Sequence, residues 1–264
     1  MVNRRPKGIP TGGQVVPTGG PEAASLHLEE HSAPPGADRQ LLGRVLESAA
    51  KLQRVVPDAV LVGGSAAALW ANHRDSLDHD HVLADLEERF DAVLEAVEAT
   101  DGWVTNRVEP GKLILGELGG IETGVRQLIR KVPLEVTNVE LPSGERVRVP
   151  TPDEILRVKA YLIVRRNQTR DYLDVVALAE RCGLEHAASV LAGIDAYYGD
   201  QRVAGADAEG VATQLARQLS DPRPRDARAT TQLNRYKGLD ARWVNWADVV
   251  GFCKQLALKM VEAG

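Results

Sequence analysis

The stretch "LVGGSAAALWANHRDSLDHDHVL", residues 61–83, decides the fold that the sequence predicts. A short apolar run ends in Gly63 and Gly64, and Ser65 then opens a segment that favours a helix. Glycines let the backbone approach a ligand closely. The N–H groups at a helix start, together with a serine hydroxyl, can hold a phosphate. The first half of this stretch therefore predicts a strand, a glycine turn and a helix that bind phosphate.

The second half of the stretch predicts a metal site. "LDHDHVL", residues 77–83, alternates like a strand, and side chains two apart in a strand share a face. Asp78 and Asp80 would repel each other on that face unless a cation lay between them. Mg²⁺ (or Mn²⁺) suits such a pair, and it usually completes its shell with water and substrate phosphates. Neighbouring phosphate and metal sites are what phosphoryl transfer needs.

The composition is that of an ordinary globular protein. The chain has 264 residues, of which 44% are hydrophobic and 26% charged, enough for one large domain or two small ones. The net charge of −5 excludes a polycation that coats nucleic acid, so any such contact must come from a local patch. Two distant cysteines, Cys182 and Cys253, favour a reducing, cytoplasmic setting. The apolar runs fall short of the roughly 18 residues of a membrane span, and no signal peptide is expected.

The chain divides into three regions. Residues 1–37 are rich in Gly and Pro and predict a disordered tail, because they cannot bury enough apolar surface to offset the entropy of ordering. Residues 38–150 predict a mixed α/β core, beginning with a helix for which Asp38 is a plausible N-cap. Within this core the pattern predicts a helix over 85–99 and strands over 59–64, 77–83, 103–108, 112–118 and 133–141.

Residues 151–264 predict a mainly helical C-terminal domain. The first helix is expected to begin with a capping box, in which Thr151 is the N-cap and Glu154 the N3 residue. Pro152 takes the first helical position, where proline is favoured. A second helix is expected to run from Arg170 to Cys182, where the glycine that follows is a natural stop signal.

Two motifs resemble known enzymes. "GGS" followed by "DSLDHDH" looks like the GS-x-DxD signature of the DNA polymerase β-like nucleotidyltransferase superfamily. "TPDEILRVKAYLIVRRNQTRDYLDVVALAE" resembles the Lys-then-RDxxDL segment of AbiEii/AbiGii toxin nucleotidyltransferases, the group that includes the MenT toxins. The matches cover residues 60 to about 182. They imply an α+β fold: a polymerase β-like nucleotidyltransferase core with a mixed sheet, followed by a mainly helical C-terminal region.

The resemblance also implies a function. It points to the toxin of a bacterial toxin–antitoxin system, a Mg²⁺-dependent enzyme that transfers NMP from an NTP to an acceptor, with a cognate antitoxin as partner. The implied acceptor is the 3′ end of tRNA, whose modification blocks translation. By the same resemblance, the residues that hold the nucleotide are Gly63, Gly64, Ser65, Lys159 and Arg170. Those that bind metal are Asp78 and Asp80. The catalytic residues are Asp78, Asp80, Lys159 and Asp174.

The residue pattern leaves the roles of several side chains open. Lys159 lies among apolar helix positions, where it either meets phosphate or extends its ammonium group to solvent. A third metal carboxylate is not obvious, and Glu122 is preferred to Glu135. Arg126 and Arg130 could reach phosphate or be solvated. The family pattern is also broken at His79, which stands where members often carry an apolar residue.

The acceptor is the least determined part of this interpretation. Residues 222–242 are basic, and Arg228, Arg235 and Lys237 could contact RNA, whereas the alternative is a flexible solvated loop. Three other functions remain open: a nucleotidyltransferase acting on a protein or an aminoglycoside-like small molecule, an HD-type metal phosphohydrolase that uses His79 and His81, and an inactive nucleotide-binding module.

Overall fold

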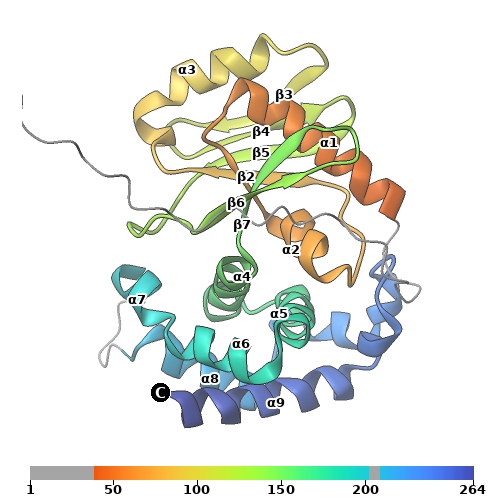
Figure 1. Cartoon of the computed structure of the whole chain (residues 1–264), viewed down its shortest axis with the longest axis vertical. Coiled ribbons are helices and arrows are strands. Elements are labelled where there is room, and N and C mark those ends of the chain that lie inside the picture. The colour runs from red at the N-terminus through yellow and green to blue at the C-terminus, as the bar shows by residue number, and fades with distance from the viewer. Residues whose placement is uncertain (1–38, 202–208) are drawn as a thin grey trace, which may run out of the picture.

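The computed structural model describes residues 39–201 and 209–264. The tail expected over 1–37 and the N-cap expected at Asp38 lie outside the described residues. The described chain is an α+β structure, in which a sheet with helices is followed by a mainly helical C-terminal half (Figure 1).

The central sheet is mixed, as expected. It has five strands in the order β1-β2-β5-β4-β3, in which β2 and β5 are parallel and the other neighbours antiparallel. The strands are β1 (Val60–Val62), β2 (His79–Leu83), β3 (Trp103–Glu109), β4 (Leu113–Leu118) and β5 (Ile121–Gln127). A separate antiparallel hairpin consists of β6 (Val136–Glu140) and β7 (Arg146–Pro150).

Two of these strands, β5 and β7, are absent from the sequence-based expectation. Strand β5 carries a glycine in its middle and two glycines before its start, which conceals its periodicity. The consequence is large for β5, because it is the parallel partner of β2 and thereby flanks the aspartate-bearing segment.

Three helices belong to the sheet half. They are α1 (Arg39–Val55), α2 (Gly63–Ala71) and α3 (Leu86–Glu98). Helix α3 lies on the side of the sheet away from the C-terminal half, and one buried cluster joins α1, α3, β4 and β5 there (Figure 1). Helix α2 lies on the other side, beside α5 of the C-terminal half.

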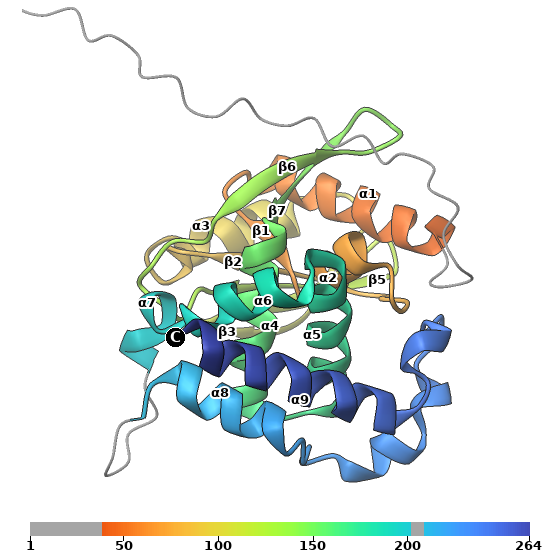
Figure 2. The ribbon, with the colours of Figure 1, turned by 60° about the horizontal axis from the view of Figure 1, so that its bottom comes forward.

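The C-terminal half packs around two central helices. Its helical segments are α4 (Pro152–Arg166), α5 (Thr169–Cys182), α6 (Leu184–Ala192), α7 (Asp195–Tyr198), α8 (Val211–Ser220) and α9 (Trp246–Ala263), with short 3₁₀ turns at Gly199–Gln201, Ala227–Thr231, Leu233–Arg235 and Ala241–Trp243. Helices α8 and α9 run along the outer side of α4 and α5 (Figure 2). One half of the capping box is confirmed, because the Thr151 side chain accepts a hydrogen bond from the Glu154 N–H. The other half is wrong: the Thr151 N–H donates to the main-chain oxygen of Glu135, and the Glu154 carboxylate pairs with Arg130 and Arg157.

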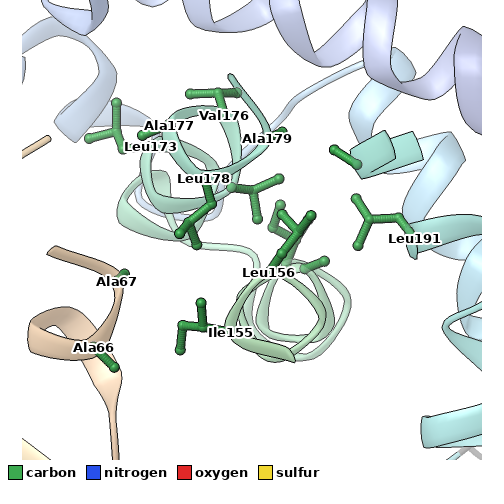
Figure 3. Close-up of a cluster of buried hydrophobic side chains, with 14 of the residues drawn as sticks. Ala66, Ala67, Ile155, Leu156, Leu173, Val176, Ala177, Leu178, Ala179 and Leu191 are labelled. Carbon is green, nitrogen blue, oxygen red and sulfur yellow. The ribbon is translucent and has the colours of Figure 1, made fainter. Parts of the chain in front are cut away.

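The largest buried cluster crosses the boundary expected at residue 150. It contains Val147 and Val149 of β7 together with residues of α2, α4, α5, α6, α8 and α9. Ala66 and Ala67 of α2 lie across from Ile155 of α4 and Leu178 of α5 (Figure 3). This shared core fixes α2, and the glycine turn at its start, against the C-terminal half.

Candidate active site

A cavity of about 650 Å³ is lined by both halves of the molecule. From the sheet half it is lined by Gly63, Gly64, Arg74, Ser76, Asp78, Asp80, Glu122 and Arg126. From the C-terminal half it is lined by Val158, Lys159, Tyr161, Leu162, Arg166, Arg170 and Tyr198. Its size is in the usual range for a small-molecule site.

Asp78 and Asp80 both line this cavity, as the alternation predicts. The side chains of β2 alternate in burial, so that His79 and His81 are buried while Asp80 is half-buried. Asp80 pairs with Gly124 of β5, where a side-chain Cβ would lie only 2.9 Å from Asp80 Oδ1. The absence of a side chain at Gly124 therefore leaves room around the carboxylate.

Glu122, not Glu135, lies near the aspartates. In the parallel register His79 pairs with Thr123, so Glu122 falls on the Asp80 face at the level of Asp78. Glu135 instead accepts hydrogen bonds from Arg157 (2.9 Å) and Tyr197 (2.6 Å), and it does not line the cavity.

The carboxylates fit a metal ion that binds together with a phosphate. Residues 39–201 and 209–264 contain no group of three or more His, Cys, Asp or Glu side chains that could hold a metal ion. Mg²⁺ is commonly held by only one or two protein carboxylates, with water and substrate phosphates completing its shell. Two cavity-facing aspartates, with Glu122 on the same face, suit that mode of binding.

The start of α2, at the glycine turn, holds the Asp78 segment in place by a hydrogen bond. Helix α2 begins at Gly63, whose φ of +74° favours glycine. The Ser65 hydroxyl is buried and donates a hydrogen bond to the main-chain oxygen of Asp78, while the Ser76 hydroxyl donates to Asp78 Oδ1 (3.0 Å). In this structure Ser65 therefore orients the Asp78 segment and does not face the cavity, whereas its expected role was to hold phosphate.

A buried cluster of charges around Asp174 places two cations, Arg74 and Lys159, on the cavity wall. The Asp174 carboxylate accepts hydrogen bonds from His73 Nε2 (2.8 Å) and Arg74 Nε (2.8 Å), and Lys159 Nζ lies 2.7 Å from it. Asp174 and Lys159 are almost fully buried, and Arg74 is 11% exposed. Lys159 thus does not extend to solvent, and its ion partner is a carboxylate from the next helix.

The electrostatics of this cluster leave a net positive charge. Burial alone would raise the pKa of Asp174, but Arg74, Lys159 and the His73 hydrogen bond hold it well below its usual value. Burial lowers the pKa of His73 despite Asp174, so the imidazole is neutral at pH 7. One carboxylate therefore faces two cations, Arg74 and Lys159, both of which line the cavity. A phosphate there would balance the surplus charge.

The structure gives Asp174 a position that the resemblance does not imply. The expectation is a catalytic carboxylate, but Asp174 is fully buried behind Arg74 and Lys159 and does not line the cavity. It is placed to orient those two cations. Sequence reasoning missed His73, Arg74 and Ser76, although all three stand in the stretch just before Asp78.

Two further arginines on the cavity wall differ in their partners. Arg166 is held by Asp171 at 2.8 and 2.6 Å. Arg170 is exposed and, within residues 39–201 and 209–264, forms no ion pair, so it is available to an anion. On the sheet side, Arg126 Nε lies 3.4 Å from Asp80 Oδ1.

The histidine-based hydrolase hypothesis does not fit this arrangement. His79 hydrogen-bonds with Ser48 (2.9 Å) and Thr123 (2.7 Å), and His81 packs against its ring. Both histidines lie on the sheet face opposite the aspartates and are fully buried. They therefore cannot share one metal ion with Asp78 and Asp80.

The basic segment 222–242 is an ordered part of the fold. Its turns are anchored by Leu233 and Trp243, which are buried, and by main-chain hydrogen bonds from Asp75 N–H to Lys237 and from Asp240 N–H to His73. The side chains of Arg228, Arg235 and Lys237 are exposed. The segment is therefore packed onto the fold through its turns, its basic side chains are solvated, and it borders the His73–Asp75 turn of the charge cluster.

Comparison with solved structures shows the fold. The nucleotidyltransferase toxin MenT4 from Mycobacterium tuberculosis H37Rv matches with a TM-score of 0.54 and 18% identity, over 84% of this chain and 83% of that chain. The chain thus shares the fold of a nucleotidyltransferase. JHP933 from Helicobacter pylori matches with a TM-score of 0.46 and 16% identity, over 86% of this chain and 94% of that chain. No family model matches the sequence.

Curated relatives are similar in sequence but much longer. The heme uptake protein MmpL11 of Mycobacterium tuberculosis is 33% identical over 254 residues, which is 87% of this chain and 23% of that protein. The mycolic acid-containing lipids exporter MmpL11 of Mycolicibacterium smegmatis is 41% identical over 135 residues, which is 50% of this chain and 13% of that protein. The chain spans about a quarter or less of these relatives. Among the described helices, none has the length and apolar character needed to cross a bilayer.

Proposed function

We propose that this chain is a Mg²⁺-dependent nucleotidyltransferase that transfers NMP from an NTP to an acceptor hydroxyl. One observation carries the proposal: Asp78 and Asp80 line the same cavity as the surplus cations Arg74 and Lys159. Carboxylates for a metal and cations for phosphate are the parts that phosphoryl transfer uses. The fold shared with MenT4 supports the proposal.

In this mechanism the residues of the chain mainly position groups and neutralise charge. Arg74, Lys159 and Arg170 bind the triphosphate, and Asp78 and Asp80 would hold the metal. A bound Mg²⁺ supplies neutralisation of phosphate charge and brings the α-phosphate close to the acceptor. The acceptor oxygen forms a bond to the α-phosphorus, the bond to the bridging oxygen breaks, and pyrophosphate leaves. The hydroxyl proton passes to a carboxylate on the aspartate face of the sheet.

The acceptor we propose is the 3′ end of tRNA, with the chain as an AbiEii-type toxin controlled by a cognate antitoxin. Two features support it. The motifs around Lys159 and Asp174 resemble that toxin group, and the exposed basic side chains of 222–242 border the turn that carries Arg74. Cations in an ordered surface segment suit the phosphate backbone of RNA.

The test is transfer of label. The purified chain is incubated with Mg²⁺, each α-labelled NTP in turn, and total RNA. We expect label on tRNA, and we expect Asp78→Asn or Asp80→Asn to abolish it without unfolding the protein, because each change removes carboxylate repulsion. Asp91→Asn, an exposed change on α3, is the matched control and should transfer like the wild type.

The outcomes separate chemistry from acceptor. If label appears on a protein or a small molecule, and the same variants abolish it, the proposed transferase activity stands and tRNA is not the acceptor. Transfer that persists in Asp80→Asn would overturn the assignment of the metal site.

A further inference from the structure

The turn that joins α4 to α5 carries two arginines of the cavity wall. Arg166 ends α4 and is held by Asp171, whereas Arg170 is the second residue of α5. Across the described parts of the chain, Arg170 forms no ion pair of its own. The position of the Arg170 side chain therefore depends on the main chain at the start of α5.

Helix α5 has no cap from the residue that precedes it. The side chain of its N-cap residue, Gln168, makes no hydrogen bond to the first turn. The acceptor comes instead from the basic segment 222–242, where Asp226 Oδ1 accepts hydrogen bonds from the Thr169 N–H (2.7 Å) and the Thr169 hydroxyl (2.9 Å). Thr169 is fully buried, so water cannot take over this role. Because the first N–H groups of a helix need an acceptor, Asp226 fixes the start of α5.

Neighbouring residues of the segment hold the same turn. The Arg225 N–H donates to the main-chain oxygen of Asn167 (2.8 Å), and the Asn167 side-chain amide donates to the main-chain oxygen of Arg223 (2.9 Å). Asn167 has a φ of +52°, a left-handed conformation that asparagine adopts more readily than most residues. The segment therefore grips the α4–α5 turn on both sides of Gln168.

The far end of the segment holds the second turn that carries a cavity cation. The Asp75 N–H donates to the main-chain oxygen of Lys237 (2.9 Å), and the Asp240 N–H donates to that of His73 (2.8 Å). Arg74 lies between these two contacts in the sequence. One surface segment thus fixes both turns from which Arg74 and Arg170 line the cavity.

We infer that Asp226 is a positioning residue for triphosphate binding, which holds Arg170 at the cavity wall by capping α5. This inference rests on the proposed function. Asp226 does not line the cavity, so it acts through Arg170. Its charge alone would have the opposite effect, because a carboxylate next to the residue before Arg170 repels a triphosphate. A role through charge predicts tighter NTP binding when Asp226 is removed, whereas a positioning role predicts weaker binding.

Binding of NTP to two Asp226 variants tests the inference. The full chain is titrated with each NTP in Mg²⁺, without RNA, by calorimetry. Asp226→Ala leaves Thr169 without its acceptor and should weaken binding about 3- to 10-fold, the range expected for one hydrogen-bonded contact. Asp226→Asn loses the charge but keeps an oxygen that can cap the helix. It should bind NTP at least as tightly as the wild type.

A double-mutant cycle shows whether Asp226 acts through Arg170. Arg170→Ala alone should weaken NTP binding. In that background Asp226→Ala should cause little further loss, because a positioning residue has no effect once the group that it positions is gone. Thr169→Val removes one of the two hydrogen bonds to Asp226 and keeps the shape of the side chain. It should weaken NTP binding by a smaller factor, and it replaces Asp226→Ala in the cycle if that variant does not fold.

Asn245→Ala is the matched control. The Asn245 side chain caps α9 by accepting a hydrogen bond from the Ala247 N–H (3.1 Å), and α9 contributes no residue to the cavity lining. The control should lower the melting temperature about as much as Asp226→Ala, by about 2–4 °C. It should keep the wild-type affinity for NTP.

The other outcomes overturn the inference in distinct ways. Tighter or unchanged NTP binding in Asp226→Ala would mean that Asp226 acts by its charge or has no role at this site. The same loss with and without Arg170 would place the effect elsewhere in the fold. The same loss in Asn245→Ala would make it a consequence of lower stability. If the wild type binds no NTP, the proposed function itself fails and this inference fails with it.

Discussion

At the scale of single residues, Asp174 illustrates how burial decides a role. A carboxylate that touched substrate would need access to the cavity, whereas Asp174 is fully enclosed by His73, Arg74 and Lys159. Without it, two buried cations would face each other without compensation, a costly arrangement. Its function in this geometry is to hold both cations at the cavity wall.

The buried histidines predict that acid destabilises the protein. Burial lowers the pKa of His79 from 6.5 to about 4, and burial lowers that of His81 well below 6.5. The unfolded chain therefore binds more protons than the folded chain below pH 6.5. The free energy of unfolding should fall as the pH drops from 6.5 towards 4, by about 3 kcal/mol for His79 alone. Urea unfolding at a series of pH values measures this slope.

A substitution of His81 isolates one part of that slope. Both ring nitrogens of His81 lack a partner within the described part of the chain. His81→Leu should therefore flatten the slope by up to about 1.4 kcal/mol per pH unit at little cost in stability at neutral pH. A His81→Leu variant that is equally acid-sensitive would contradict the prediction.

At the scale of elements, the strand–turn–helix unit β1–α2 holds the aspartate segment by close contact. A Cβ at Gly64 would lie 2.5 Å from Ser76 Oγ and 3.1 Å from Arg74 Nη2. The absence of a side chain at this position lets the α2 start lie against the residues that orient Asp78 and face the cavity.

Two glycine substitutions test this packing. Gly64→Ala should displace Ser76 and Arg74, lower the free energy of unfolding by about 1–3 kcal/mol and weaken NTP binding. Gly43→Ala on α1 has nothing within 4 Å of the added Cβ and should raise the free energy of unfolding by up to about 1 kcal/mol. Urea unfolding compares the two. Wild-type stability and NTP affinity in Gly64→Ala would show that the close contact is unimportant.

At the scale of the whole molecule, charges of both signs line the cavity from several elements. The sheet contributes Asp80, Glu122 and Arg126, the α2–β2 turn contributes Arg74 and Asp78, and α4 and α5 contribute Lys159, Arg166 and Arg170. The basic turns of 222–242 add exposed cations beside the turn that carries Arg74, although the chain as a whole has a net charge of −5. RNA binding is therefore expected to be local.

Charge reversal in this segment predicts a specific loss of RNA binding. The double variant Arg228→Glu, Arg235→Glu should weaken RNA binding and leave NTP affinity unchanged. The number of counterions released on RNA binding, measured from the salt dependence of the affinity, should fall by about one for each phosphate that is no longer bound. Filter binding over a range of salt concentrations measures both effects. Arg44→Glu, an exposed change on α1, is the control for net charge. Unaltered RNA binding by the double variant at low salt would remove this segment from the acceptor site.

The sequence by itself determined the local features of this protein. The strand–glycine–helix order of 60–71, the opposite faces of Asp80 and His81, and the N-cap at Thr151 all follow from periods and turn chemistry within a few residues. Such features depend on neighbours along the chain, so a pattern can predict them.

Only the tertiary structure decided which side chains meet. Lys159 pairs with Asp174 on the next helix, and Arg74 reaches the same carboxylate from 100 positions earlier in the chain. Glu122 lies beside the aspartates because β5 pairs with β2 in parallel, and the glycines in and before β5 hide that strand from its sequence pattern. These pairings follow from how distant segments pack in a shared core, and local periodicity carries no information about that packing.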